Sequence, residues 1–125
     1  MEKIFTEQVP EPAGHYSQAV VHNGLVYVSG QLSIDPDTGE TCTGSIENQT
    51  EHALKNVEAI LSAAGSRLDQ VLKVTVFVAD ISLWSRVNAV FARIFGSHKP
   101  ARVVVPVKEL HYGCLVEIDA IAIVS

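Results

Sequence analysis

The chain has 125 residues and a mass of 13.5 kDa, the size of one domain. Apolar residues make up 47% of it and charged residues 18%, so the composition excludes a disordered protein. The net charge is −5, from 9 basic and 14 acidic side chains, and the basic ones form no cluster. Because nucleic-acid binding needs clustered cations, this balance argues against a dedicated nucleic-acid binder, although a ribonuclease is compatible with it.

The sequence also bears on the cellular compartment. No apolar run reaches the ~18–20 residues that a membrane-spanning helix needs. Glutamates interrupt the first residues of the chain, so we expect neither a signal peptide nor a transit peptide. Without an export signal, Cys42 and Cys114 are expected to be reduced thiols in a cytoplasmic protein.

The first half of the chain predicts a hairpin followed by a helix. An extended lead-in covers residues 1–14, and two strands follow at Ser17–Val21 and Leu25–Ser29. The Asn-Gly pair between these strands is a strong hairpin signal. Apolar residues at helical spacing then predict a helix over Ile46–Ala64, for which Ser45 can provide the N-cap.

The second half predicts a strand, a helix and two more strands. Val71–Ala79 is apolar and rich in β-branched residues, which favours a buried strand. Ser82 can cap a second amphipathic helix that ends near Phe95. Two further strands are expected at Arg102–Val107 and Leu115–Val124. The order β-β-α-β-α-β-β predicts a two-layer α+β fold, with both helices on one face of a mostly antiparallel sheet.

The other face of this sheet bears on assembly. Residues 1–125 form a single small domain. The last two strands predict a largely apolar second sheet face, and a small domain does not leave such a face exposed to solvent. We therefore expect copies of the chain to pack through this face in a closed ring. If Val103 and Val105 face the helices, Arg102 faces away from them.

Arg102 and Glu117 are the first candidates for chemistry. Arg102 stands alone in an apolar strand, and a guanidinium is not buried without partners. It can bind a small carboxylate through two parallel hydrogen bonds, or form a structural ion pair with Glu117 or Asp119. Glu117 also has apolar neighbours, and it can position or deprotonate a water or simply neutralise Arg102. The residues alone leave these alternatives open.

Two positions beside the first strands can also reach a ligand. The Tyr16 phenol can donate a hydrogen bond, although a core or interface tyrosine is the commoner case. Gly30 lets a ligand approach backbone amides, or it is a plain strand end. The five histidines match no metal-binding motif, so we expect no metal site.

Several stretches, spread over nearly the whole chain, match one known family. The most specific is the pair Pro100-Ala101-Arg102 and Val116-Glu117-Ile118. The others are Gly14-His15-Tyr16-Ser17-Gln18-Ala19, Val28-Ser29-Gly30-Gln31, Gln49 to Gly65, Val74-Thr75-Val76-Phe77-Val78 and Val87-Asn88. On these motifs the chain resembles the reactive intermediate (enamine/imine) deaminase family, also called the YjgF/YER057c/UK114 or endoribonuclease L-PSP family.

The resemblance implies a chorismate-mutase-like fold of the Bacillus type and a homotrimer with one cleft at each subunit interface. It implies that Arg102 grips the carboxylate of the substrate and that Glu117 holds or activates a water. The residues implied to line the cleft are Tyr16, Ser29, Gly30 and Asn88. The implied activity is hydrolysis of reactive 2-enamine and 2-imine acids, such as 2-aminoacrylate, to 2-keto acids and ammonia, with no cofactor.

The chain departs from the family pattern at three positions. His15 and His111 stand where the family commonly has proline. They reflect drift in two loops, or they add titratable donors to the cleft and shift its substrate class. Val104 stands in the cleft wall where the best-known deaminases have cysteine, and we expect this change to matter little.

Two other functions compete with the deaminase. The first is a non-catalytic binder of a small metabolite such as a keto acid, which would use the same Arg102 and Glu117. The second is an endoribonuclease that inhibits translation, against which the acidic charge argues.

Overall fold

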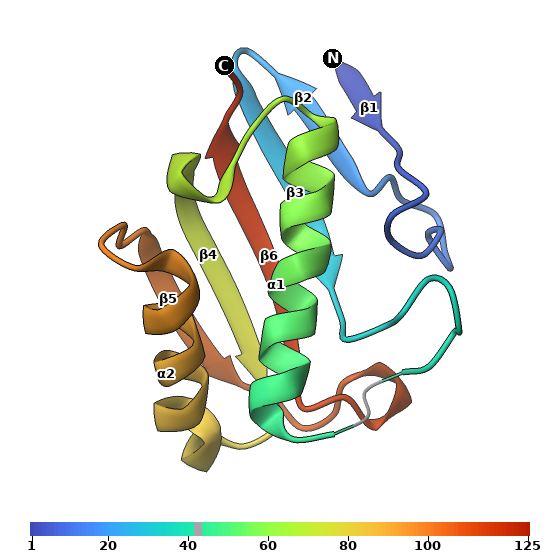
Figure 1. The fold of residues 1–125 in the computed structure, drawn as a ribbon. Helices are drawn as coiled ribbons and strands as arrows, with labels where there is room; N and C mark the ends of the chain where they lie inside the picture. Colours follow the sequence, from blue (N-terminus) through green and yellow to red (C-terminus); the bar gives the residue numbers. More distant parts are fainter. Residues whose placement is uncertain (42–43) are drawn as a thin grey trace.

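The computed structural model describes residues 1–41 and 44–125. Six strands form one sheet in the order β1-β2-β3-β6-β4-β5, and both helices lie on the same face of it (Figure 1). β4 and β5 run parallel, and the other neighbouring strands run antiparallel. The strands are β1 (Glu2–Ile4), β2 (Ala19–His22), β3 (Leu25–Gln31), β4 (Val71–Val78), β5 (Ala101–Pro106) and β6 (Val116–Ile123), and the helices are α1 (Ile46–Ala63) and α2 (Trp84–Phe95). The predicted two-layer α+β fold is confirmed.

Two local predictions are wrong. Part of the expected lead-in is strand β1, which pairs with β2 through Lys3 and Val20. This edge strand has only three residues, too few to show an alternating pattern. The cap before α2 is also shifted: the Asp80 carboxylate, not the Ser82 hydroxyl, accepts a hydrogen bond, and it does so from the Ser82 amide at 2.8 Å. A short helical turn at Ile81–Leu83 then leads into α2. Aspartate favours this local bond to the amide two residues on.

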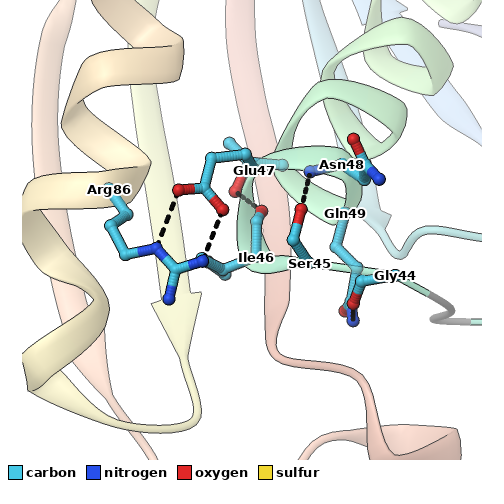
Figure 2. Close-up of polar contacts among 8 residues, drawn as sticks. Gly44, Ser45, Ile46, Glu47, Asn48, Gln49 and Arg86 are labelled. Carbon is cyan, nitrogen blue, oxygen red and sulfur yellow. Dashed lines mark hydrogen bonds and ion pairs between the residues drawn. The ribbon is translucent and has the colours of Figure 1, made fainter.

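The start of α1 is held by its cap and by α2. The Asn48 amide donates to Ser45 Oγ at 3.1 Å, which confirms the predicted N-cap. Glu47 in the first turn accepts two hydrogen bonds from Arg86 on α2, both at 2.7 Å (Figure 2). The Arg86 guanidinium is the main reason that the pKa of Glu47 falls to about 2. The two helices are thus joined by a bidentate ion pair.

The core fills the space between the helices and the sheet. Leu54, Ile60 and Leu61 of α1 are fully buried there, together with Ile118 of β6. The opposite face of the sheet carries apolar side chains that no described element covers. Its large members Tyr27, Val103 and Ile123 are 43–44% exposed. The predicted apolar second face is therefore present, while the closed ring of copies stays a prediction.

The cysteine prediction needs correction. Cys114 is buried just before β6 and is disulfide-bonded, so the expected reduced thiol at this position is wrong. Disulfide formation depends on the distance between two Cα atoms in the fold, which sequence spacing does not reveal. Cys42 lies outside the described residues. Among the residues that the structure describes, no helix combines the length and apolar character that crossing a membrane requires. The cytoplasmic location stays a prediction.

Candidate active site

A hollow of about 490 Å³ opens beside the end of β3 and the start of β6. The N-terminal segment around Tyr16 forms one wall, and the loop before β6 with His111 forms another. Ser29, Gly30 and Glu117 line the strand side of the hollow. Five of the predicted site residues are therefore neighbours around one cavity.

The contact between Gly30 and Glu117 shapes this hollow. A Cβ atom at position 30 would lie only 2.7 Å from Glu117 Oε2, so any side chain there would displace the carboxylate. The register between β3 and β6 shifts between Val28 and Gln31, which brings the backbone of Gly30 against Glu117. Gly30 is thus the residue that makes room for the Glu117 carboxylate.

Burial makes the Glu117 carboxyl a weaker acid than an exposed glutamate, since its pKa is raised. The half-buried position of the side chain raises the pKa of its carboxyl above the ordinary value, because the charged form is poorly solvated. The Asp119 carboxylate raises this pKa further, and the charge of His111 opposes the rise. A carboxylate of raised pKa in a cavity is suited to taking a proton from water.

Polar contacts hold the N-terminal wall of the hollow in place. The Ser29 hydroxyl donates to the Ser17 carbonyl at 2.6 Å, and the Ser29 amide donates to the Gln18 carbonyl at 2.9 Å. The buried Gln18 amide in turn donates to the carbonyls of Thr6 and Pro10, both at 3.1 Å. Tyr16, directly before Ser17 in the chain, is 54% exposed at the rim of the hollow. Its phenol therefore faces solvent rather than the core.

Arg102 lies elsewhere in the same chain. Its Nη2 donates to Asn88 Oδ1 of α2 at 3.0 Å. The guanidinium also lies 5.0 Å from the ring centre of Phe91 and 5.4 Å from that of Trp84, both on α2. Partial burial lowers the pKa of Arg102 below its ordinary value, although a guanidinium stays charged at any physiological pH. The aromatic rings and Asn88 hold the cation without neutralising it.

Strand register places Arg102 and Glu117 on opposite faces of the sheet. Arg102 is opposite Val74, which is buried under the helices, so Arg102 faces α2. Glu117 is opposite Phe77, three residues along β4, and so points to the other face. The alternative considered from the sequence, in which Val103 and Val105 face the helices and Arg102 faces away, is therefore not the one in the structure. β5 is apolar on both faces, so alternation could not orient it.

The same register excludes a structural ion pair for Arg102 within one chain. Such a pair with Glu117 or Asp119 cannot form, because both carboxylates lie on the other face of the sheet. Val104 is opposite Val76 and shares the helix face with Arg102. The predicted residues thus fall into two groups. The hollow has Tyr16, Ser29, Gly30, His111 and Glu117, and the helix face has Asn88, Arg102 and Val104.

Several residues of the hollow were not predicted from the sequence, and one of the two candidate histidines lies outside it. His111 lines it, whereas His15 is exposed and lies outside its lining. Asn56 of α1 also lines it, and its amide donates to the carbonyls of Leu32 and Ile34 at 3.1 and 3.2 Å. A polar residue in the apolar stripe of a helix was the available signal.

Comparison with known proteins fits this arrangement. The family model for Endoribonuclease L-PSP matches residues 6–124. A RutC family protein of Pyrococcus horikoshii is 48% identical over 121 residues, which cover 97% of this chain and 96% of that protein. Reactive Intermediate Deaminase A, chloroplastic, of Arabidopsis thaliana is 40% identical over 121 residues, or 97% of this chain and 65% of that protein. The structure of E. coli TdcF with bound serine has a TM-score of 0.94 at 34% identity and covers 100% of both chains.

These likenesses confirm the resemblance drawn from the sequence motifs. They also agree with the predicted chorismate-mutase-like arrangement of two helices on one sheet. The family includes a protein named for deaminase activity, which makes a deaminase role the general expectation for its members.

Proposed function

The chain belongs to the Endoribonuclease L-PSP family, and from that premise we propose that it hydrolyses 2-imino and 2-enamino acids, such as 2-aminoacrylate, to 2-keto acids and ammonia. The proposal assigns the carboxylate of the substrate to Arg102 and the attacking water to Glu117. The relative named Reactive Intermediate Deaminase A supports the reaction class. The serine bound to TdcF supports a small amino-acid-like ligand.

The site in this proposal is shared between two copies of the chain. Arg102 and Glu117 point to opposite faces of one sheet, and no small substrate touches both in a single chain. A second copy packed on the uncovered apolar face would bring its own residues to the hollow. We therefore place each site between two subunits, with Arg102 and Asn88 from one and Glu117 and Gly30 from the other, in a homotrimer.

The chemistry needs one water and no redox step. The enamine first tautomerises to the imine, gaining a proton at carbon and losing one from nitrogen. The Glu117 carboxylate then accepts a proton from water as the water oxygen bonds to the imine carbon. Glu117 returns that proton to the nitrogen, which gives the neutral carbinolamine. The hydroxyl proton of the carbinolamine then moves to the nitrogen as the C–N bond breaks, so that ammonia leaves and the C=O of the keto acid forms. Arg102 holds the substrate carboxylate throughout, which fixes the carbon in front of the water.

The observation that carries the proposal is the uncompensated charge of Arg102. Ion pairs of arginine in residues 1–41 and 44–125 involve Arg67, Arg86 and Arg93, and none involves Arg102. A half-buried guanidinium held by a neutral amide and two aromatic rings still has donors for an external carboxylate.

The direct test is release of pyruvate from 2-aminoacrylate made in situ by a serine dehydratase. The wild-type protein should accelerate it, and Arg102→Ala should not. If the wild type gives no acceleration but binds pyruvate in an Arg102-dependent manner, the protein is a binder and the proposal fails. If instead RNA is cleaved, with steep salt dependence and loss in Arg102→Ala, the ribonuclease alternative replaces it.

A further inference from the structure

His111 is the one basic side chain among the described residues that line the hollow. The other ionisable groups of the lining that can carry a charge near neutral pH are carboxylates, namely Glu11, Glu109 and Glu117. An imidazole ordinarily gains or loses its charge between about pH 5 and 8. His111 is therefore the one described lining residue that can place a positive charge near Glu117.

The loop geometry fixes where the His111 ring lies. His111 begins a short helical turn, and its ring meets the Tyr112 ring edge-on, with centres 5.6 Å apart. Tyr112 has a φ of 62°, in the left-handed region that non-glycine residues seldom adopt. The turn therefore holds the imidazole beside an aromatic partner at the wall of the hollow.

On this geometry we infer that His111 is a positioning residue for Glu117. Its imidazolium keeps the Glu117 carboxylate ionised, so that the carboxylate is ready to take a proton from water. The inference rests on the proposed function, because it supposes that Glu117 acts as a base there. His15 carries no such role, since it lies outside the lining of the hollow.

The charges around Glu117 give the direction of the effect. Burial and the neighbouring Asp119 on β6 raise the pKa of Glu117, and His111 lowers it. The segments of β3 and β4 next to Glu117 offer Ser29, Gly30 and Phe77, which carry no charge. Removal of His111 thus takes away the cation that opposes protonation of Glu117, and Glu109 and Glu11 remain as further negative charge.

The test compares pH profiles of kcat/KM for wild type, His111→Gln and His111→Lys, with His15→Gln as the matched control. His111→Gln should move the midpoint of the acid limb to higher pH, by about 0.5–1 pH unit. His111→Lys, which keeps a cation, should restore the wild-type limb or move it lower. His15→Gln should match wild type. Because His111 is exposed, these variants should fold normally.

A second readout separates this inference from the proposed function. The Glu117 carboxyl can be titrated by carbon NMR without substrate, and its midpoint should rise in His111→Gln alone. If the protein turns over 2-aminoacrylate, but His111→Gln has the same pH profile and the same Glu117 midpoint as wild type, the inference is overturned and the deaminase proposal stands. Absence of turnover in wild type with a shifted Glu117 midpoint would overturn the deaminase and leave the electrostatic coupling intact.

Discussion

Arg102 and Glu117 stand on opposite faces of one sheet, under α2 and in the open hollow respectively. Each has the partners that its face provides: Asn88 and aromatic rings for the cation, and the bare backbone of Gly30 for the carboxylate. Neither group neutralises the other within one chain. Their separation is what makes a shared site between copies the simplest way to use both.

The first prediction concerns the geometry of the cation. Arg102→Lys keeps a positive charge but loses the planar pair of donors that matches a carboxylate. Loss of hydrogen bonds to a charged group should lower kcat/KM for 2-aminoacrylate about 100-fold or more. Arg93→Lys, on the exposed surface of α2, is the control and should behave as wild type. An Arg102→Lys enzyme of wild-type activity would show that no carboxylate is gripped there.

The second prediction concerns Gly30. In Gly30→Ala the new methyl group would meet Glu117 Oε2 at 2.7 Å, so the carboxylate must swing away. We expect kcat to fall about 10-fold or more with little change in the melting temperature, because the displaced side chain is at a cavity. Gly14→Ala is the control, since its methyl group would meet only the Tyr16 ring at an ordinary 3.6 Å. Equal activity of both variants would contradict the assigned role of Glu117.

The fold was largely readable from the sequence, and the orientation of the site was not. Helical spacing and the Ser45 cap located α1, and the Asn-Gly pair located the hairpin. β5 is apolar on both sides, so only its pairing with β4, from Arg102 opposite Val74, decides which face the guanidinium takes. Such pairing is long-range information. The role of Gly30 likewise depends on a register shift between β3 and β6 that no local pattern reveals.

The third prediction concerns the uncovered sheet face. Val103 is 44% exposed there, on the edge strand β5, and a charge at this position should prevent packing of a second sheet. We expect Val103→Asp to sediment as a single chain, to keep its circular dichroism spectrum and to lose deaminase activity. Phe5→Asp replaces a side chain that is 57% exposed outside the sheet, and it should keep the wild-type mass and activity. A Val103→Asp protein of wild-type mass would place the subunit contact elsewhere.

The fourth prediction concerns the ion pair between the helices. Arg86 is the main cause of the fall in the pKa of Glu47 from 4.5 to about 2, so the pair stabilises the fold above about pH 4.5 and loses this effect as pH falls toward 2. In urea unfolding, the small stability deficit of Glu47→Gln should therefore be constant near neutral pH and vanish by about pH 2. Glu58→Gln, on an exposed part of the same helix, should show no such pH dependence. A Glu47→Gln deficit that persists at pH 2 would mean that the lost stability comes from packing and not from charge.

The most direct test of the shared site is complementation between two inactive variants. Arg102→Ala and Glu117→Gln, each inactive alone, would be co-expressed in equal amounts so that their subunits mix. A site built from Arg102 of one chain and Glu117 of another is intact in about one quarter of random pairings, so about a quarter of wild-type activity should return. If the mixed protein forms and remains as inactive as its parents, Arg102 and Glu117 do not meet across an interface, and the proposed site is wrong.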